Sequence, residues 1–436
     1  MAPATSLLTD HYELTMVEAA LAAGTASRRS VFEVFARRLP EGRRYGLLAG
    51  TGRVLEGLAD FRFGTAELDF LADRKVVNER TLNWLADFSF KGTITGYAEG
   101  EIYFPGSPLL QVESTFAEAC ILETYLLSVL NFDTAVASAA SRMIAVADDR
   151  PCIEMGSRRT HEHSAVAAAR AAIIAGFGAT SNLEAGRSYG LPTTGTAAHS
   201  FTLLHDSERE AFQAQVATLG QGTTLLVDTY DVEQGVRTAV EVAGPELGGV
   251  RLDSGDLVEQ ARWVRSLLDE LGNTNTRIVV TSDLDEYAIA SLRSAPVDAY
   301  GVGTQLVTGS GHPTAGMVYK LVSREGNDGQ WKDVAKAAIG KASVGGRKSA
   351  YRRLNERGRA TAEVVGIDET PERTERDRDL IVPLVVDGEL QPGFTGADGV
   401  KRAIERRKAS IEELPGAARQ MLRGEPVIPT VFVDEH

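Results

Sequence analysis

One motif combines an arginine and an aspartate in a way that could bind an anionic aromatic ligand. In VRLDSGDL, residues 250–257, Arg251 and Asp253 are two positions apart and would point to the same face of a strand. An arginine fork can bind a planar carboxylate through two hydrogen bonds. Because a buried arginine needs an anionic partner, an internal salt bridge between the two is the alternative interpretation.

Two further segments are candidates for phosphate binding. In AYGVGTQL, residues 299–306, Gly303 would let backbone N–H groups approach a phosphate, and Thr304 would add a hydroxyl donor. In GSRRTHEHS, residues 156–164, Arg158 follows a short apolar run and would contact phosphate or diphosphate. Short glycine patterns are weak signals, so a simple tight turn remains the alternative for the glycine segment.

A histidine and a threonine share a glycine-bearing segment, GLPTTGTAAHSF, residues 190–201. His199 lies three positions after Thr196 and could act as an acid, a base or a phosphate acceptor. A structural role is the alternative, as for most single histidines. Asp228, at the end of TTLLVDTY, could accept from a sugar hydroxyl, help to hold magnesium, or cap the next helix.

The other histidine pair gives no metal site. His161 and His163 lie two positions apart, without a third ligand at a known zinc spacing. A position at a helix start or on the surface is the expected alternative. The metal ligands, if any, stay undetermined from the sequence.

These motifs belong to a repeated pattern that begins at Cys152. Short apolar runs, each ending in polar or glycine-rich residues, alternate with helical stretches: CIEMG, GATSN, LPTTGT, TTLLVDTY, GGVRLDSGD, RIVVTSDLDE and AYGVGTQL. This alternation predicts an α/β fold with a parallel sheet or barrel, whose chemistry lies at the carboxyl ends of the strands. One rim of the sheet should therefore carry the polar residues Glu154, Thr196, Asp228, Asp253, Asp283 and Thr304.

The length and the changes of pattern predict more than one domain. A chain of 436 residues exceeds what one hydrophobic core usually serves. We expect a mixed α+β domain over residues 1–140, the α/β barrel over 141–330, and a C-terminal segment, 331–436, that packs with the first domain.

The composition excludes several classes of partner. With 46 Lys and Arg against 60 Asp and Glu, the net charge of -14 would repel nucleic acid and anionic membranes. The only cysteines are Cys120 and Cys152, which suits a reducing compartment. No signal-peptide pattern and no run of eighteen apolar residues is present, so we expect a cytoplasmic protein without a membrane anchor.

Taken in order, several of these segments resemble the nicotinate phosphoribosyltransferase family: TDHYELTM, GSRRTH, GTAAHSF, LLVDTY, VRLDSGDL, SDLDE and GVGTQLVT. The match runs from Thr9 to about Leu321. It implies an irregular α/β barrel with a smaller mixed domain, an enzyme that joins nicotinate to phosphoribosyl diphosphate in NAD synthesis, and a homodimer. Tyr12 matches a tyrosine that contacts the pyridine ring, often from the neighbouring subunit, although a core position on an amphipathic helix is also possible.

The resemblance also implies roles for the residues of the barrel. Thr196 and Arg251 match residues near nicotinate, with Arg251 as the partner of its carboxylate, and Thr304 matches a phosphoribosyl contact. His199 matches a histidine that ATP phosphorylates, so ATP hydrolysis would be coupled to product formation. Asp228 and Asp253 would then serve ribose hydroxyls or Mg²⁺.

Related enzymes with other substrates remain the closest alternatives. Nicotinamide-specific relatives carry an aspartate in a stretch that aligns with FGATSN, where this chain has Ser181. An aspartate would repel the carboxylate of nicotinate, so the serine favours the acid. A quinolinate phosphoribosyltransferase is a further alternative, and a non-catalytic phosphate-binding barrel is one from another class. Retention of His199, Arg251 and Thr304 together favours an enzyme.

Overall fold

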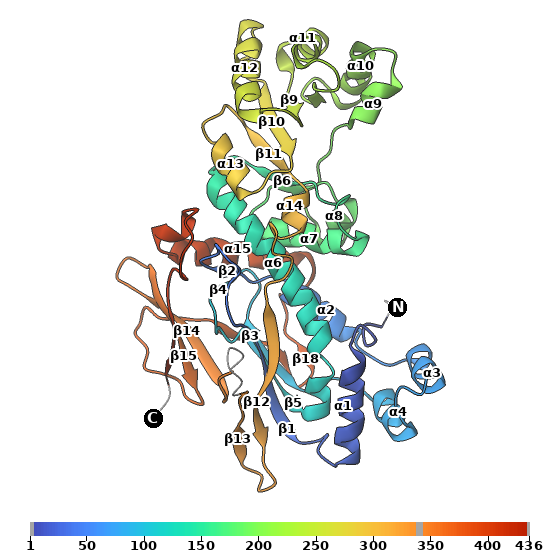
Figure 1. Ribbon diagram of the computed structural model, residues 1–436, viewed down its shortest axis with the longest axis vertical. Helices are drawn as coiled ribbons and strands as arrows, with labels where there is room; N and C mark the ends of the chain where they lie inside the picture. Colours follow the sequence, from blue (N-terminus) through green and yellow to red (C-terminus); the bar gives the residue numbers. More distant parts are fainter. Residues whose placement is uncertain (1–3, 337–342, 434–436) are drawn as a thin grey trace. The chain divides into compact units, whose positions relative to one another are not determined.

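The computed structural model describes residues 4–336 and 343–433, and the chain forms two compact units (Figure 1). The first unit comprises Met1–Ser138 and His312–His436, and the second comprises Ala139–Gly311. The barrel had been expected to run from 141 to 330. Residues 312–330 instead belong to the first unit, because β12 (Met317–Glu325) pairs antiparallel with β1 (Arg29–Ala36). Of the expected domains, residues 1–3, 337–342 and 434–436 lie outside the described residues.

The second unit is built on six parallel strands in the order β7-β6-β11-β10-β9-β8. Their bounds are β6 (Cys152–Glu154), β7 (Ala179–Thr180), β8 (Thr224–Leu226), β9 (Gly249–Leu252), β10 (Arg277–Ser282) and β11 (Ala299–Val302). The last strand, β11, returns to pair with the first, β6, as a barrel requires. The sheet ends at β7 and β8, so it is an open, irregular barrel. The predicted parallel βα architecture is confirmed.

One expected strand is absent from this sheet. The run LPTTGT forms only a single parallel bridge, between Thr180 and Thr193. Pro192 has no N–H to donate to a ladder, although its carbonyl accepts from the Thr180 N–H at 3.0 Å. The prediction of a full strand here was wrong, because proline and glycine interrupt the run.

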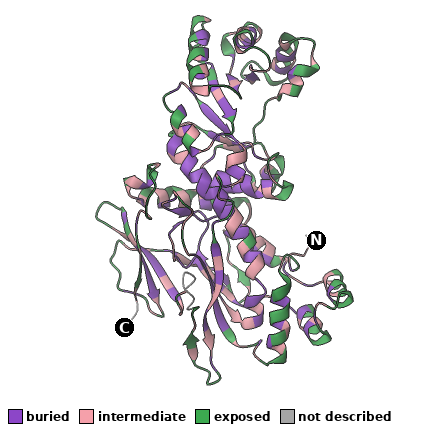
Figure 2. Ribbon diagram, viewed as in Figure 1, coloured by how far each residue is buried: buried purple, intermediate pink, exposed green. Residues whose placement is uncertain are grey.

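Helices follow the strands of the second unit (Figure 1). Side chains cap most of these helices. Asn182, Ser207, Asp231, Asp256 and Asp285 each accept a backbone N–H from the first turn of the following helix. The helices are α7 (Glu162–Ile174), α8 (Leu183–Tyr189), α9 (His199–Leu204), α10 (Glu208–Leu219), α11 (Val232–Ala243), η1 (Gly244–Glu246), α12 (Leu257–Glu270), α13 (Glu286–Leu292) and α14 (Thr304–Val307). Figure 2 shows that the strands are largely buried, whereas α10, α11 and α12 expose one face.

The first unit contains a seven-stranded antiparallel sheet in the order β13-β12-β1-β5-β3-β17-β18 and a four-stranded sheet in the order β16-β14-β15-β19. The strands not yet given are β2 (Gly46–Leu47), β3 (Thr93–Tyr97), β4 (Ile102–Tyr103), β5 (Leu110–Thr115), β13 (Trp331–Asp333), β14 (Lys348–Leu354), β15 (Ala360–Ile367), β16 (Arg378–Asp379), β17 (Ile381–Val386), β18 (Glu389–Leu390) and β19 (Thr430–Val433). Because β17 pairs with β3, the C-terminal segment shares a sheet with the N-terminal one.

The helices of the first unit surround a mixed core. They are α1 (His11–Ala22), α2 (Thr51–Ala59), α3 (Thr65–Asp73), α4 (Glu79–Ala86), α5 (Phe116–Cys120), α15 (Gly396–Glu413) and η2 (Gly416–Arg419). Besides apolar side chains, the core holds Arg352, which has no exposed side-chain surface and forms ion pairs with Glu101 at 3.0 Å and Glu363 at 2.7 Å. This network ties β14 and β15 to the segment before β4.

Helix α6 (Glu123–Ala147) runs from the first unit into the second. Together with α5 it forms the one stretch among the described residues, Phe116–Ala147, that is long and apolar enough to cross a membrane. That test rests on length and composition alone. In its most apolar window 67% of the residues are buried inside the structure, as in the core helix of a folded domain.

Candidate functional site

Arg251 is the centre of a polar cluster at the carboxyl ends of β8, β9 and β10. Its Nε donates to the Thr281 hydroxyl at 3.0 Å, and one terminal nitrogen donates to the Ala197 carbonyl at 3.3 Å. The other terminal nitrogen lies 3.5 Å from a carboxylate oxygen of Asp253. The internal ion pair considered from the sequence is therefore present. A guanidinium has five N–H donors, so donors remain on both terminal nitrogens for a ligand.

The Asp228 carboxylate organises the turn that follows β9. One of its oxygens accepts from the Asp253 N–H at 2.8 Å and from the Ser254 hydroxyl at 3.1 Å. The other is buried without a hydrogen-bond partner in the described structure and lies 4.0 Å from Nε2 of His199. Asp231, not Asp228, caps the following helix, so the capping interpretation of Asp228 was wrong.

His199 joins this cluster from α9, whose first residue it is. Its Nδ1 lies 3.1 Å from the Thr229 hydroxyl, and its Nε2 lies 3.7 Å from a carboxylate oxygen of Asp253. The side chain is 41% exposed, so a ligand can reach the ring. Thr196 lies in the exposed segment before α9, next to the Ala197 carbonyl that Arg251 binds.

The two predicted phosphate-binding turns pack against each other at the ends of β6 and β11. The Met155 N–H donates to the Val302 carbonyl at 2.8 Å. A Cβ atom on Gly156 would lie 3.2 Å from the carbonyl oxygen of Gly303 and would overlap the Val307 side chain, so this close packing of the turns requires glycine. Thr304 begins α14, and Arg158 lies exposed in the turn after Gly156.

Gly301 connects these turns with the arginine cluster. It lies opposite Thr281 in the pairing of β10 with β11. A Cβ atom on Gly301 would lie 2.4 Å from Cγ2 of Thr281 and 2.8 Å from the sulfur of Met155. The carboxyl ends of β6, β8, β9, β10 and β11 and the turns after them thus form one continuous polar edge, which we call the rim.

Tyr12 lies on α1 in the first unit, with 45% of its surface exposed. Burial, and next the neighbouring Glu123, raise the pKa of Tyr12 to about 12. The phenol is therefore neutral at physiological pH and suited to contact an uncharged ring face. His161, by contrast, is the N-cap of α7, where its Nδ1 accepts from the His163 N–H at 3.3 Å.

Sequence reasoning missed two hydroxyl groups of the rim. Thr281 bonds both Arg251 and Asp253, and Thr229 bonds His199. Both follow apolar runs that had been recognised as strands, and this position was the available signal. Asp283 lies in the turn after β10, as expected for a rim residue, and is exposed there.

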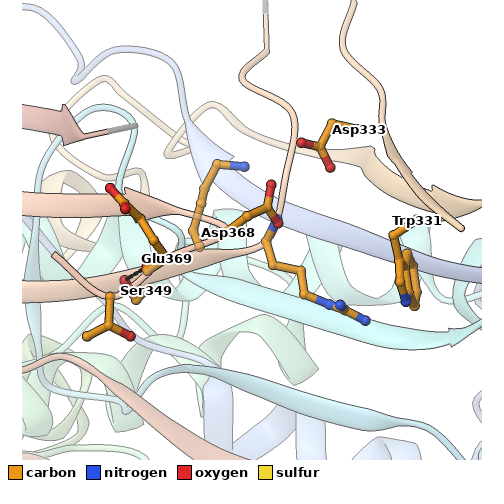
Figure 3. Close-up of a pocket in the computed structure, with 8 residues that line it drawn as sticks. Trp331, Asp333, Ser349, Asp368 and Glu369 are labelled. Carbon is orange, nitrogen blue, oxygen red and sulfur yellow. Dashed lines mark hydrogen bonds between the residues drawn. The ribbon is translucent and has the colours of Figure 1, made fainter. Parts of the chain in front are cut away.

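The first unit contains a cleft of about 640 Å³, and none of the rim residues lines it (Figure 3). Its lining includes Trp331, on which the Arg347 guanidinium stacks at 3.9 Å, and the acidic pair Asp333 and Asp368. Burial and then Asp368 raise the pKa of Asp333. None of the predicted substrate-binding residues lines this cleft.

Comparisons with known proteins agree with the geometry. The model of the nicotinate phosphoribosyltransferase N-terminal domain matches residues 7–131, and that of the nicotinate phosphoribosyltransferase family matches residues 151–357. The chain is 56% identical to a nicotinate phosphoribosyltransferase of Mycobacterium tuberculosis, over 97% of this chain and 94% of the relative. It is 38% identical to that of Bacillus subtilis, over 80% and 74%.

A solved structure is similar over nearly the whole chain. The crystal structure of human nicotinic acid phosphoribosyltransferase superposes with a TM-score of 0.83 at 25% identity and covers 97% of both chains.

Proposed function

Because this chain belongs to the nicotinate phosphoribosyltransferase family and forms nicotinate mononucleotide and diphosphate from nicotinate and phosphoribosyl diphosphate, we propose that the rim of the second unit is its catalytic site. The observation that carries this proposal is the cluster of Arg251, Asp253, Asp228 and His199, which the ends of β8 and β9 and the start of α9 bring together.

The reaction needs no protein nucleophile at carbon. The lone pair of the pyridine nitrogen attacks C1 of the phosphoribosyl group, while the bond from C1 to the diphosphate oxygen breaks and the diphosphate leaves with the electron pair. The transition state has oxocarbenium character. The protein must align the two substrates, neutralise the leaving group and exclude water.

The side chains of the rim divide these tasks. Arg251, with Thr196 near it, would bind the carboxylate of nicotinate through its remaining N–H donors, with the guanidinium held by Thr281. Arg158 and the turn of Gly303 and Thr304 would bind the phosphates of phosphoribosyl diphosphate.

Asp228 and Asp253 would bind ribose hydroxyls or Mg²⁺. No group of three or more His, Cys, Asp or Glu within residues 4–336 and 343–433 could hold a metal by itself. This fits Mg²⁺, which proteins often bind through one or two carboxylates together with substrate phosphates. The partly exposed Asp253 is the better candidate, because the Asp228 side chain is only 2% exposed. Bound there, the ion would supply positive charge for the diphosphate.

We also propose that ATP phosphorylates His199. The ring is oriented by Thr229 at one nitrogen and is exposed enough to meet a phosphate. A phosphate on this ring would add negative charge beside the rim, which favours magnesium and the active arrangement.

The test is transfer of the γ-phosphate from labelled ATP to the protein. Wild type should take up acid-labile label, and His199→Ala should take up none and lose the stimulation of turnover by ATP. His205→Ala is the matched control, since His205 directly follows the same helix and bonds the Phe201 carbonyl at 2.9 Å. Equal labelling of His199→Ala and wild type would remove His199 from this role.

The assembly and the location are proposals as well. We propose a cytoplasmic homodimer in which Tyr12 contacts the pyridine ring. Cys120 and Cys152 are both free and buried, which suits a reducing compartment, and burial raises the pKa of each thiol to about 12.

A further inference from the structure

We propose that Glu154 is a positioning residue for phosphoribosyl diphosphate, because its carboxylate fixes the turn that carries Arg158. Glu154 is the last residue of β6 and has no exposed surface. It does not reach the solvent-exposed part of the rim itself. Its role must therefore act through the backbone and side chains that it holds.

The two carboxylate oxygens of Glu154 bind two different turns. Oε1 accepts the N–H of Gly156, at the start of the turn that contains Arg158. Oε2 accepts the hydroxyl of Thr180, the last residue of the neighbouring strand β7. One side chain thus joins the ends of two adjacent strands.

Further hydrogen bonds extend this connection to the residue next to Arg158. The Thr180 hydroxyl also accepts from the Asn182 N–H at 2.9 Å. The Asn182 side-chain amide in turn donates to the Ser157 hydroxyl at 3.0 Å. A chain of bonds therefore runs from Glu154 through Thr180 and Asn182 to Ser157.

Burying the Glu154 carboxylate lowers the stability of the fold, which a purely structural position would not require. Burial raises the pKa of Glu154, and only the Thr180 hydroxyl and the Gly156 N–H oppose that shift. No arginine or lysine in the described part of the chain forms a salt bridge with it. A buried charge without a counter-ion costs stability, and such sites are expected where function requires a fixed geometry.

Arg158 itself depends on this turn. Its side chain is exposed, and it forms no hydrogen bond or ion pair within the residues that the structure describes. The backbone of the turn, which Glu154 and Ser157 hold, therefore sets where the Arg158 side chain leaves the chain and in which direction it starts. This inference rests on the proposed contact between Arg158 and the diphosphate.

The experiment compares steady-state kinetics and thermal unfolding of five variants. Glu154→Gln and Thr180→Val each disturb the Glu154–Thr180 bond, and Thr180→Ser keeps it. Glu286→Gln is the matched control, because Glu286 is an equally buried carboxylate of the same unit that pairs with Arg142 at 2.9 Å. Arg158→Ala tests the diphosphate contact itself.

We expect Glu154→Gln and Thr180→Val to raise KM for phosphoribosyl diphosphate by about tenfold. The KM for nicotinate should stay near that of wild type, and Thr180→Ser should behave as wild type. If both variants only unfold at lower temperature, with a KM no higher than that of Glu286→Gln, Glu154 is merely structural and the inference is wrong.

Arg158→Ala distinguishes the proposed contact of Arg158 with the diphosphate from the proposed positioning role of Glu154. If it raises KM for phosphoribosyl diphosphate while the Glu154 and Thr180 variants do not, only the positioning role is overturned. If it leaves that KM unchanged, the diphosphate contact proposed above and this inference are both overturned.

Discussion

Arg251 serves the rim in two ways, as a candidate partner of the substrate carboxylate and as a link between Ala197, Thr281 and Asp253. Its side chain is only 15% exposed, so its N–H donors are largely shielded from competing water. A charge-assisted hydrogen bond in such a place contributes more than one at the surface.

Arg251→Ala should lower kcat/KM for nicotinate by about tenfold to hundredfold, mainly through KM, because a hydrogen bond to a charged group contributes about 1.5–3 kcal/mol. Arg251→Lys should recover only part of this, since lysine lacks the planar fork. Arg265→Ala is the control, because Arg265 also bonds backbone carbonyls, of Thr276 and Asn273, but lies on α12. Unchanged nicotinate kinetics in Arg251→Ala would remove it from the site.

Glu33 gives a prediction about pH. It pairs with Lys348 at 3.0 Å, yet burial raises its pKa from 4.5 to about 7. Between pH 4.5 and about pH 7, the Glu33 carboxyl holds a proton in the folded protein that it has lost in the unfolded chain. The contribution of Glu33 to the unfolding free energy is therefore greatest below about pH 4.5 and is lost as the pH rises to about 7. The unfolding free energy of wild type minus that of Glu33→Gln should fall from pH 5 to pH 7. A difference that stays constant or rises would contradict this.

The sequence could predict which residues of the site lie near one another only where they follow parallel strands, because the carboxyl ends of such strands lie at one edge of the sheet. Asp228 and Asp253 follow different strands, and the βα pattern was enough to place both on one rim. His199 was predicted from its own motif and from the family resemblance, and the structure brings its ring within 4.0 Å of Asp228. Their partners Thr281 and Thr229 were missed, because a threonine after an apolar run has no distinguishing mark until the neighbouring strand is known.

At the scale of elements, the sequence predicted the parallel strands well, but it predicted one strand too many and the wrong end for the second unit. LPTTGT had the composition of a strand end, but Pro192 and Gly195 leave it only one bridge, and the barrel is open at that side. The barrel had been predicted to end at residue 330, but the second unit ends at Gly311. The prediction was wrong because the apolar strand β12 looks like one more strand of the barrel. Its partner β1 lies about three hundred residues earlier, and no local pattern reveals such a pairing.

The buried network around Arg352 gives a prediction at this scale. Arg352 joins β14 to Glu363 of β15 and to Glu101. Replacing it by methionine would leave the Glu363 carboxylate buried without a cation, and would leave Glu101 with Arg378 alone. Such a loss costs about 3–5 kcal/mol, which should lower the midpoint of thermal unfolding by several degrees or more.

The control is the surface pair of Arg29 and Glu113, in which the arginine side chain is 58% exposed. Arg29→Ala should change the midpoint little, because exposed pairs contribute about 0–1 kcal/mol. If calorimetry gives equal shifts for Arg29→Ala and Arg352→Met, the network does not stabilise the first unit as described.

At the scale of the whole molecule, the proposed homodimer predicts complementation between inactive variants. Tyr12→Ala and Arg251→Ala should each be nearly inactive at low nicotinate concentration. If Tyr12 completes the site of the partner subunit, refolding the two variants together should restore about a quarter of wild-type activity, because half of the dimers would contain one intact site of two. Sedimentation should show a dimer. A mixture no more active than its components would place Tyr12 in the site of its own chain or outside any site.

The most direct test of the central claim is mononucleotide formation from phosphoribosyl diphosphate with Mg²⁺, with and without ATP, and with nicotinate, nicotinamide and quinolinate offered in parallel. The rim, with Arg251 for the carboxylate and Ser181 in place of an acidic residue, predicts product from nicotinate in clear preference to the other two, and faster turnover when ATP is converted to ADP. A preference for nicotinamide or quinolinate would contradict the assignment of the nicotinate site, and no diphosphate from any of the three would contradict the enzyme itself.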